Sequence, residues 1–470
     1  MYVVKKKRII FKNVDVIDIG SKGLSICKTK EDIIVMVKNG VPGDIVDIET
    51  YKKRKNYFLG NIIKYHSFSK SRTNPKCSHF GLCGGCGWQN MLYESQTKYK
   101  ELKIKHLFKN IFNIDKINPI VNCDENFYYR NKLEFSFTDS RWLTENEIKS
   151  GENKIDRLGI GFHLSGKWNK VIDIEKCYLQ NDLSNKIRLS LKKFSKTNNI
   201  TFYNSKFNNG LLRSLMIRNS SLNEFMVVLQ FCENKFEEIN RVMTHLKLSF
   251  KEITSLQYII NNKKNDSIYD QKIHLFNGKE YINEKIKNLN FKIYPKSFFQ
   301  TNIKQTVVLY EIVKKLCDFK GKEIVYDLYS GLGTISQFIS NKVKKVIGIE
   351  SIYDAVESAK KSAIQNCIDN AEFVVGDMKN IFNEKFIQKY GKADLIITDP
   401  PRDGMHKNVI NELLKLETPK IIYISCNPST QHRDLEMLNC KYKILSVQPV
   451  DMFPHTNHVE NIVLLKLRDQ

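Results

Sequence analysis

The amino-acid sequence predicts an α/β protein: a C-terminal doubly wound, mainly parallel sheet, preceded by a small β-barrel and a central α+β region. Three observations lead to this prediction. From Phe291 onward, short apolar runs alternate with helical segments, as in a parallel sheet covered by helices. Residues 8–63 hold short β-rich runs separated by Gly and Pro, and a chain of 470 residues is too long for one compact core. We therefore expect three domains, at residues 1–63, 64–290 and 291–470.

The N-terminal segment has the pattern of a small barrel. Its β-rich runs lie at 9–16, 33–37 and 45–48. The basic run Lys52-Lys53-Arg54-Lys55 is followed by Tyr57 and Phe58, and oligonucleotide-binding barrels mix charge and aromatic residues in this way. A solvated hairpin would have the same composition.

The central region begins with a Cys/Gly-rich loop at 72–90 and a lysine-rich helix from about Leu92 to Asn110. Beyond it the pattern mixes strands and helices, as in an α+β domain. We predict strands at 133–138, 159–164 and 225–231 and a helix near 183–196.

The C-terminal region has a regular alternation. We predict strands at 323–328, 345–350, 372–375, 394–398 and 420–425, followed by two terminal strands. We predict helices at 304–319, 334–341, 352–368, 380–390, 406–416 and 429–438. In open sheets of this kind, ligands bind at the carboxyl ends of the strands.

Composition narrows the class of partner. Lys and Arg exceed Asp and Glu by 24, and the Lys residues are spread along the chain, which favours a polyanion such as RNA as the partner. The alternative is a Lys- and Asn-rich translation of an AT-rich genome. No apolar stretch approaches the ~20 residues of a membrane helix. The eleven unevenly spaced cysteines indicate a reducing cytoplasm with metal or catalytic thiols, and no obligate protein partner is evident.

A cofactor pocket is predicted after the first strand of the C-terminal sheet. The segment Gly331-Leu332-Gly333 lets the backbone approach a ligand, but Ser336 stands where a dinucleotide fingerprint would need a third glycine. Glu350 ends the second strand, where an acid can accept both hydroxyls of an adenosine ribose. With Asp377 and Asp399 after later strands, this pattern suits S-adenosylmethionine better than NAD. The alternative is that these acids cap helices.

A cysteine stands at the rim of the same sheet. The apolar run 421–424 opens into Ser425-Cys426-Asn427-Pro428, which presents the thiol of Cys426 at a strand end. Asp399-Pro400-Pro401-Arg402 follows the preceding strand, and residues 454–460 end in Glu460. A nucleophile, a carboxylate and a candidate base are thus expected in one domain.

Three cysteines, Cys77, Cys83 and Cys86, form a tight cluster in the Gly-rich loop. Thiols this close in a cytosolic protein indicate a metal ion or an iron–sulfur cluster. Cys177 is the best candidate for a fourth ligand, with Cys123 as the alternative, and zinc is the alternative metal. The remaining cysteines are expected to be buried small apolar residues: Cys27, Cys232, Cys317, Cys367 and Cys440.

Together these motifs closely resemble the class I RNA uracil-5 methyltransferases that have a TRAM barrel and an iron–sulfur cluster and act on 23S ribosomal RNA. The resemblance covers essentially the whole chain. Related bacterial transfer-RNA enzymes lack the barrel and the cysteine cluster, which favours the ribosomal class. The motifs are Cys77/Cys83/Cys86/Cys177, Tyr129-Arg130-Asn131-Lys132, Ser297-Phe298-Phe299-Gln300-x-Asn302, Asp327-Leu328-Tyr329-x-Gly331-x-Gly333, Asp399-Pro400-Pro401-Arg402, Ser425-Cys426-Asn427-Pro428-x-Thr430 and Pro454-His455-Thr456-x-His458-x-Glu460.

The resemblance implies an S-adenosylmethionine-dependent methyltransferase domain and a basic helix, at about 91–122, that packs on it. It implies a nucleophile at Cys426 and a proton acceptor at Glu460, and Thr334 stands where relatives often have Asn. The implied cofactor contacts are Gln300, Tyr329, Glu350 and Asp399. The implied [4Fe-4S] ligands are Cys77, Cys83, Cys86 and Cys177.

The chemistry explains the need for a thiol. Carbon 5 of uracil is a poor nucleophile, and addition of a thiolate at carbon 6 turns the ring into an enolate that can attack a methyl group. Phe298 or Phe299 could stack on the extruded base, or both could be core residues. The predicted function is thus methylation of carbon 5 of a uridine in 23S ribosomal RNA. The alternatives are the same reaction on the T-loop of transfer RNA and a non-catalytic RNA-binding assembly factor.

Overall fold

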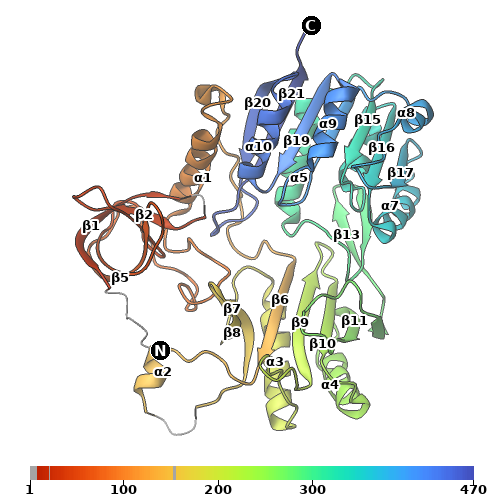
Figure 1. The fold of residues 1–470 in the computed structure, drawn as a ribbon. Coiled ribbons are helices and arrows are strands. Elements are labelled where there is room, and N and C mark those ends of the chain that lie inside the picture. Colours follow the sequence, from red (N-terminus) through yellow and green to blue (C-terminus); the bar gives the residue numbers. More distant parts are fainter. Residues whose placement is uncertain (1–7, 21, 152–154, 470) are drawn as a thin grey trace, which may run out of the picture.

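The computed structural model describes residues 8–20, 22–151 and 155–469. It has three parts: a barrel, a central sheet and a C-terminal sheet covered by helices (Figure 1). Residues 1–7, which belong to the expected barrel domain, lie outside the described residues.

The N-terminal part is a closed barrel of five strands, where the sequence predicts a small barrel, and its strand order is β1-β2-β3-β5-β4. Its core is formed by inward-facing apolar side chains such as Val16, Cys27 and Val46. The last strand runs beyond residue 63. The strands are β1 (Ile10–Ile19), β2 (Ser25–Lys28), β3 (Ile34–Val37), β4 (Ile45–Lys53) and β5 (Phe58–Ser67).

The central part is a seven-stranded sheet with strand order β12-β11-β10-β9-β6-β7-β8. Its core packs α3 (Asp182–Thr197) and α4 (Phe236–Ser249) against the sheet through residues such as Leu191 and Val242. The strands are β6 (Lys132–Thr138), β7 (Gly159–Leu164), β8 (Lys167–Asp173), β9 (Leu212–Asn219), β10 (Phe225–Phe231), β11 (Ile253–Ile260) and β12 (Ile273–Gly278). A short helix α2 (Glu145–Lys149) lies between β6 and β7, and the hairpin β13 (Ile282–Ile286)–β14 (Leu289–Ile293) leads into the last part.

The C-terminal part is a seven-stranded sheet with strand order β17-β16-β15-β18-β19-β21-β20. Its first five strands are parallel, and β21 joins antiparallel to β19. The order reverses between β15 and β18, and such a switch point is where open α/β sheets bind ligands. The strands are β15 (Ile324–Leu328), β16 (Lys345–Glu350), β17 (Ala371–Val375), β18 (Leu395–Thr398), β19 (Lys420–Ser425), β20 (Tyr442–Val450) and β21 (Glu460–Leu467).

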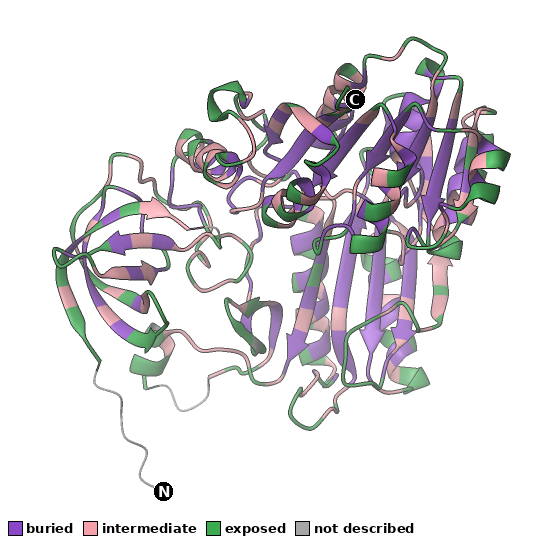
Figure 2. Ribbon diagram, turned by 45° about the horizontal axis from the view of Figure 1, so that its top comes forward, coloured by how far each residue is buried: buried purple, intermediate pink, exposed green. Residues whose placement is uncertain are grey.

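Helices cover both faces of this sheet, and its central strands β15, β16, β18 and β19 are buried along almost their whole length (Figure 2). Successive residues of a strand point to opposite faces. Ile422 accordingly packs with α5 and α6, whereas Tyr423 packs with α8, α9 and α10. The helices are α5 (Ile303–Cys317), α6 (Thr334–Ile339), α7 (Tyr353–Gln365), α8 (Glu384–Tyr390), α9 (Lys407–Leu416) and α10 (Pro428–Leu438).

Helix α1 (Tyr93–Phe108) comes before the central sheet in the chain but packs beside α10 and β20 (Figure 1). Its Ile104 and Phe108 belong to the same apolar cluster as residues of α9 and α10. Lys100 is fully buried and donates to Asp451 Oδ1 at 2.6 Å and to the Phe453 carbonyl at 3.0 Å. Removal of either charge would leave the other buried without a partner, so this pair fixes α1 on the C-terminal part.

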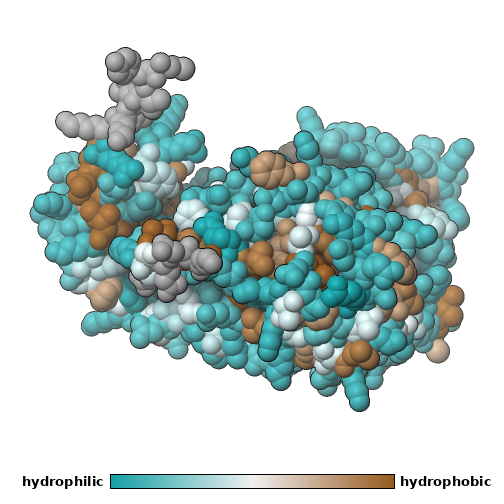
Figure 3. Space-filling view, turned by 90° about the horizontal axis from the view of Figure 1, so that it is seen from below, coloured by the Kyte–Doolittle hydropathy of each residue, from teal (hydrophilic) through white to brown (hydrophobic). Residues whose placement is uncertain are grey.

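Over the part drawn in colour, the face seen in Figure 3 is largely hydrophilic, with small separate hydrophobic areas. This surface agrees with the high content of charged residues in the sequence. Among the described residues, we find no helix with the length and apolar character needed to span a membrane.

Candidate active site

Cys426, Glu460 and Asp399 lie together at one edge of the C-terminal sheet. Cys426 follows the last residue of β19, Glu460 begins β21, and Ser425 pairs with Asn461 across these two strands. Asp399 follows β18, the other neighbour of β19. Cys426 and Glu460 are therefore neighbours across adjacent strand ends, whereas the sequence argument only placed them at strand ends or loops of one domain.

A second loop is fastened beside Cys426. The side chains of Asn427 and Thr430 both donate to the Arg402 carbonyl, at 2.9 and 3.1 Å. Asn427 also caps α10, through its side-chain oxygen and the Ser429 backbone N–H. These bonds hold the exposed Arg402 next to the thiol, and we had not assigned a role to it from the sequence.

Burial controls the electrostatics of this edge. Burial, with Glu460 and Asp399, raises the pKa of Cys426 to about 11, and Arg402 opposes the rise. Burial, with Asp399, raises the pKa of Glu460 to about 8. Burial and the nearby Asp327 raise the pKa of Asp399 to about 7. The free site therefore favours a neutral thiol and a protonated Glu460 at pH 7, and Arg402 is the cation that favours their ionised forms.

A pocket lies beside this edge, at the switch point between β15 and β18. Gln300, Tyr329 and Asp399 line it, together with Thr334 and Tyr310. Tyr310 and Thr334 are joined by a 2.7 Å hydrogen bond between their hydroxyls. Three of the four predicted cofactor residues are thus brought together, whereas nothing in the sequence pattern pointed to Tyr310.

Glu350, the fourth predicted cofactor residue, lies at the end of β16 and does not line this pocket. Its carboxylate accepts from the Gly331 backbone N–H at 3.1 Å and from the Ser351 and Ile352 backbone N–H groups at 2.7 and 2.9 Å. Tyr329, with φ 62°, turns the chain sharply after β15. Glu350 therefore holds the glycine loop in place at the edge of the pocket.

The two candidate stacking residues occupy different environments. Both rings line the pocket, but Phe299 is 6% exposed and packs in the core, whereas Phe298 is 71% exposed. The structure therefore leaves Phe298 as the ring available to a base.

The segment before Glu460 is fixed by the N-terminal half of the chain. Gln96 donates to His455 Nδ1 at 3.2 Å and accepts from the His455 backbone N–H at 2.7 Å. The backbone N–H groups of Gly87 and Trp88 both donate to the His455 carbonyl, at 2.9 and 3.0 Å. Tyr129 donates to the Pro454 carbonyl at 3.0 Å. The residues after the cysteine loop thus position the residues before Glu460.

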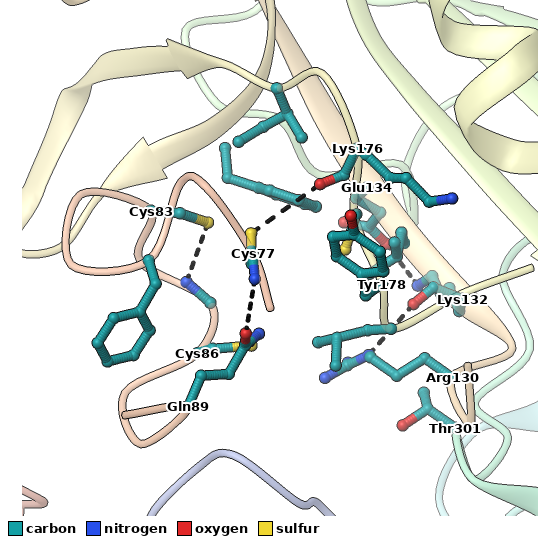
Figure 4. Close-up of a pocket in the computed structure, with 17 residues that line it drawn as sticks. Cys77, Cys83, Cys86, Gln89, Arg130, Lys132, Glu134, Lys176, Tyr178 and Thr301 are labelled. Atoms are coloured by element: carbon teal, nitrogen blue, oxygen red, sulfur yellow. Dashed lines mark hydrogen bonds and ion pairs between the residues drawn. The ribbon is translucent and has the colours of Figure 1, made fainter. Parts of the chain in front are cut away.

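The cysteines Cys77, Cys83, Cys86 and Cys177 line a single cavity of about 400 Å³ (Figure 4). The Gly85 backbone N–H donates to Cys83 Sγ at 3.4 Å, and the Gln89 side chain donates to Cys86 Sγ at 3.2 Å. Among the described residues, no group of three or more His, Cys, Asp or Glu side chains is arranged to hold a metal ion.

The other cysteines divide into two groups. Cys27, Cys232 and Cys317 are buried as predicted, but Cys367 and Cys440 are exposed, so their expected burial was wrong. Cys440 follows α10 and Cys367 follows α7, and both lie in the turn after a helix, outside its apolar face. Cys123, the alternative fourth ligand, does not line the cavity, and its thiol lies 3.5 Å from the side-chain nitrogen of Asn302.

The fold and the pocket define an S-adenosylmethionine-dependent methyltransferase. The family described as tRNA (Uracil-5-)-methyltransferase matches residues 220–468. An uncharacterized RNA methyltransferase of Bacteroides thetaiotaomicron is 45% identical over 95% of this chain and 100% of that protein. One of Porphyromonas gingivalis is 40% identical over 96% of this chain and 99% of that protein.

A solved structure is also similar along the whole length. The Pyrococcus abyssi tRNA (uracil-54, C5)-methyltransferase in complex with S-adenosyl-L-homocysteine matches with a TM-score of 0.75 and 28% identity, over 96% of this chain and 99% of that chain. This chain belongs to the RNA uracil-5 methyltransferase family, and it is an RNA (uracil-5-)-methyltransferase.

Proposed function

We propose that this enzyme methylates carbon 5 of a specific uridine in 23S ribosomal RNA through a covalent bond between Cys426 and carbon 6 of the uracil. The observation that carries the proposal is the pairing of Ser425 with Asn461, which places Cys426 beside Glu460 at the edge of the cofactor pocket. S-adenosylmethionine, when bound, supplies the electrophilic methyl group.

Each site residue has a separate role in the proposed reaction. Cys426 loses its proton to solvent and adds through its thiolate Sγ to carbon 6, which makes carbon 5 nucleophilic, and after methyl transfer carbon 5 carries both a methyl group and a proton. Glu460 takes that proton, and the Cys426–carbon 6 bond breaks to restore the double bond and the thiolate. Gln300, Tyr329 and Asp399 hold the cofactor from the pocket side, and Glu350 holds it at the glycine loop. Phe298 stacks on the extruded base.

The same geometry suits a second substrate, the T-loop uridine of transfer RNA. The full-length similarity to the archaeal transfer-RNA enzyme favours this candidate, because that similarity includes the barrel and cysteine regions. Those regions therefore do not by themselves select ribosomal RNA. A non-catalytic role would leave a complete pair of Cys426 and Glu460 without a use.

Mapping of 5-methyluridine in total RNA from a strain that lacks the gene tests this proposal. We expect a single 23S position to lose the modification and a plasmid copy of the gene to restore it. Loss confined to transfer RNA would replace the proposal with the second candidate. No loss in any RNA would contradict both.

We also propose that Cys77, Cys83, Cys86 and Cys177 hold a [4Fe-4S] cluster. Four thiols on one cavity suit a cluster, in which each iron takes one thiolate, and N–H donors to Cys83 and Cys86 are of the kind that tune cluster sulfurs. The cluster would fasten the loop that leads to Gly87 and Trp88, which hold His455. We further assign a barrel, a cluster domain and a catalytic domain, with the predicted boundary at 63 moved to the end of β5 at Ser67 and the predicted boundary at 290 moved out of β14 to the start of β13 at Ile282.

Anaerobic purification tests the cluster. We expect about four iron and four sulfide per chain in the wild type, and loss of both in the Cys83→Ser variant. The Cys440→Ser variant, with an exposed thiol remote from the cavity, is the matched control and should keep both. Zinc without sulfide in the wild-type protein would contradict the assignment.

A further inference from the structure

Beside the cysteine cavity, one lysine lies among three aromatic rings. Lys76 Nζ is 4.9 Å from the ring centroid of Phe127, 5.3 Å from that of Tyr128 and 4.9 Å from that of Tyr178. We call these four residues the Lys76 cage. Tyr178 and Lys176 also border the cysteine cavity (Figure 4).

The cage has an exposed face. Tyr128 is 39% exposed, whereas the next residue, Tyr129, is 7% exposed and points into the core. Tyr128 has φ 57°, a conformation that costs energy for a bulky residue and is fixed by a 2.8 Å hydrogen bond from its N–H to the Tyr178 carbonyl. Packing alone does not require this turn, because it moves an aromatic ring into solvent. Strained backbone of this kind is found at sites that bind ligands.

The charge of the cage is available to a partner. Among the described residues, no carboxylate pairs with Lys76, which is exposed, whereas the neighbouring Lys176 forms an ion pair with Asp182 at 3.1 Å. Arg130, on the cavity side, likewise has no carboxylate partner in the described part of the chain, and its guanidinium lies 5.9 Å from the Phe453 ring centroid. An unneutralised cation beside aromatic rings is the combination that single-stranded nucleic acids bind.

The cage is connected to the catalytic edge. The ring centroids of Phe127 and His455 are 4.4 Å apart, and His455 lies in the segment that leads to Glu460. Asn131, which follows Arg130, donates from its side chain to the Gln300 carbonyl at 3.0 Å. RNA bound at the cage would therefore be continuous with a uridine that enters the pocket.

We propose that the Lys76 cage is a second RNA subsite, in which a base flanking the target uridine stacks on the exposed ring of Tyr128 while its phosphate contacts Lys76. The proposal rests on the RNA substrate of the proposed function. It explains why Tyr128 is exposed in a strained conformation and why Lys76 has no acidic partner. The competing explanation is that Lys76 only straps the cysteine loop to the central part of the chain.

The test measures binding apart from turnover. The probe is a fluorescein-labelled single-stranded RNA of about 12 nucleotides, with adenosines on both sides of one uridine. Because one stacked base contributes about 1–3 kcal/mol, Tyr128→Gly should weaken binding about 5- to 150-fold. Glycine suits the positive φ at this position, so the variant removes the ring without adding strain. Tyr128→Phe should bind like the wild type.

The Lys76→Gln variant distinguishes an RNA-binding role of Lys76 from a purely structural role in holding the cysteine loop. We expect the slope of log Kd against log salt to fall by about 0.7, the value for one phosphate contact on a single strand. A strap would instead lower the melting temperature or the iron content with the salt slope unchanged. Phe207→Ala is the matched control, because this ring is also exposed and Lys206 Nζ lies 5.0 Å from its centroid. Phe207 precedes the start of β9, whereas Asn131, close to the cage in sequence, contacts the end of β9.

The outcomes distinguish this proposal from the proposed function. Equal binding by Tyr128→Gly and the wild type, an unchanged salt slope in Lys76→Gln, or an equal loss in Phe207→Ala would overturn the subsite. Lack of binding by the wild type would overturn it too. Cage-dependent binding without 5-methyluridine in any RNA would leave the subsite standing and remove the proposed function.

Discussion

Replacement of Cys426 by alanine is expected to reduce methyl transfer by at least about 10⁴-fold while leaving RNA binding intact, since removal of a covalent nucleophile has effects of this size or larger. Without the thiolate, nothing in the site makes carbon 5 nucleophilic. Alanine fits the position, because the residue follows β19 at its edge and is only partly buried. Incorporation of a radioactive methyl group into substrate RNA under single-turnover conditions is the measurement.

The covalent step has its own readout. RNA with 5-fluorouridine at the target should remain attached to the wild type after denaturation, because fluorine cannot leave as a proton and the thiolate cannot then be expelled. Cys426→Ala should form no adduct, whereas Cys440→Ala, which removes an exposed thiol on the same part of the chain, should form it normally. Full activity in Cys426→Ala would remove the residue from the mechanism.

The raised pKa values give the thiol a distinct resting state. Burial raises the pKa of Cys426 to about 11, so the thiol is protonated in the free enzyme at pH 7. Arg402 is held beside it by Asn427 and Thr430 through the Arg402 carbonyl. Arg402 is the nearby cation that opposes the rise in the pKa of the thiol.

The C-terminal sheet could be predicted closely because its signals are local. The predicted strands at 345–350 and 420–425 agree with β16 and β19, since a mainly apolar run of this length between helical segments is typical of a buried parallel strand. The predicted helix at 380–390 is shorter in the structure, because α8 begins after Asn383, which caps it.

The central sheet was harder to predict for a physical reason. Strand β9 pairs with β6, from which β7, β8 and α3 separate it in the chain, and β11 pairs parallel with β10 while the other pairings in the sheet are antiparallel. Such pairings are decided by tertiary packing, which a local pattern does not record.

The residues that hold the active-site segments in place could not be predicted from the sequence either. Gln96 and Lys100 look like ordinary polar residues of a basic helix, yet they are buried and hold His455 and Asp451, more than 350 residues away. A long separation in sequence leaves no spacing to recognise. The candidate residues Cys426, Asp399 and Glu460 could be proposed from the sequence, because each stands in a motif at a predicted strand end or loop.

The second large effect is expected in the Glu460→Gln variant. The covalent complex between Cys426 and the RNA should accumulate, with carbon 5 of the uracil already methylated. The amide leaves addition and methyl transfer possible but cannot take the proton from carbon 5, so expulsion of Cys426 should slow by about 10²–10⁴-fold, the usual contribution of a general base. Burial raises the pKa of Glu460 to about 8, so release of product by the wild type should accelerate as pH rises through about 8. This dependence should disappear in the variant.

The variant should fold, which keeps the test decisive. Because the pKa of Glu460 is raised from 4.5 to about 8 in the folded protein, the folded state binds this proton more tightly than the unfolded chain. The carboxyl therefore costs stability increasingly as pH rises from about 4.5 to about 8, and glutamine removes that cost. A denaturing gel after one turnover with labelled cofactor should show the labelled methyl group on a protein–RNA band. This band should be absent in the double variant Glu460→Gln/Cys426→Ala. Free methylated RNA released at the wild-type rate would mean that another group takes the proton, because the amide at position 460 has no basic oxygen to accept it.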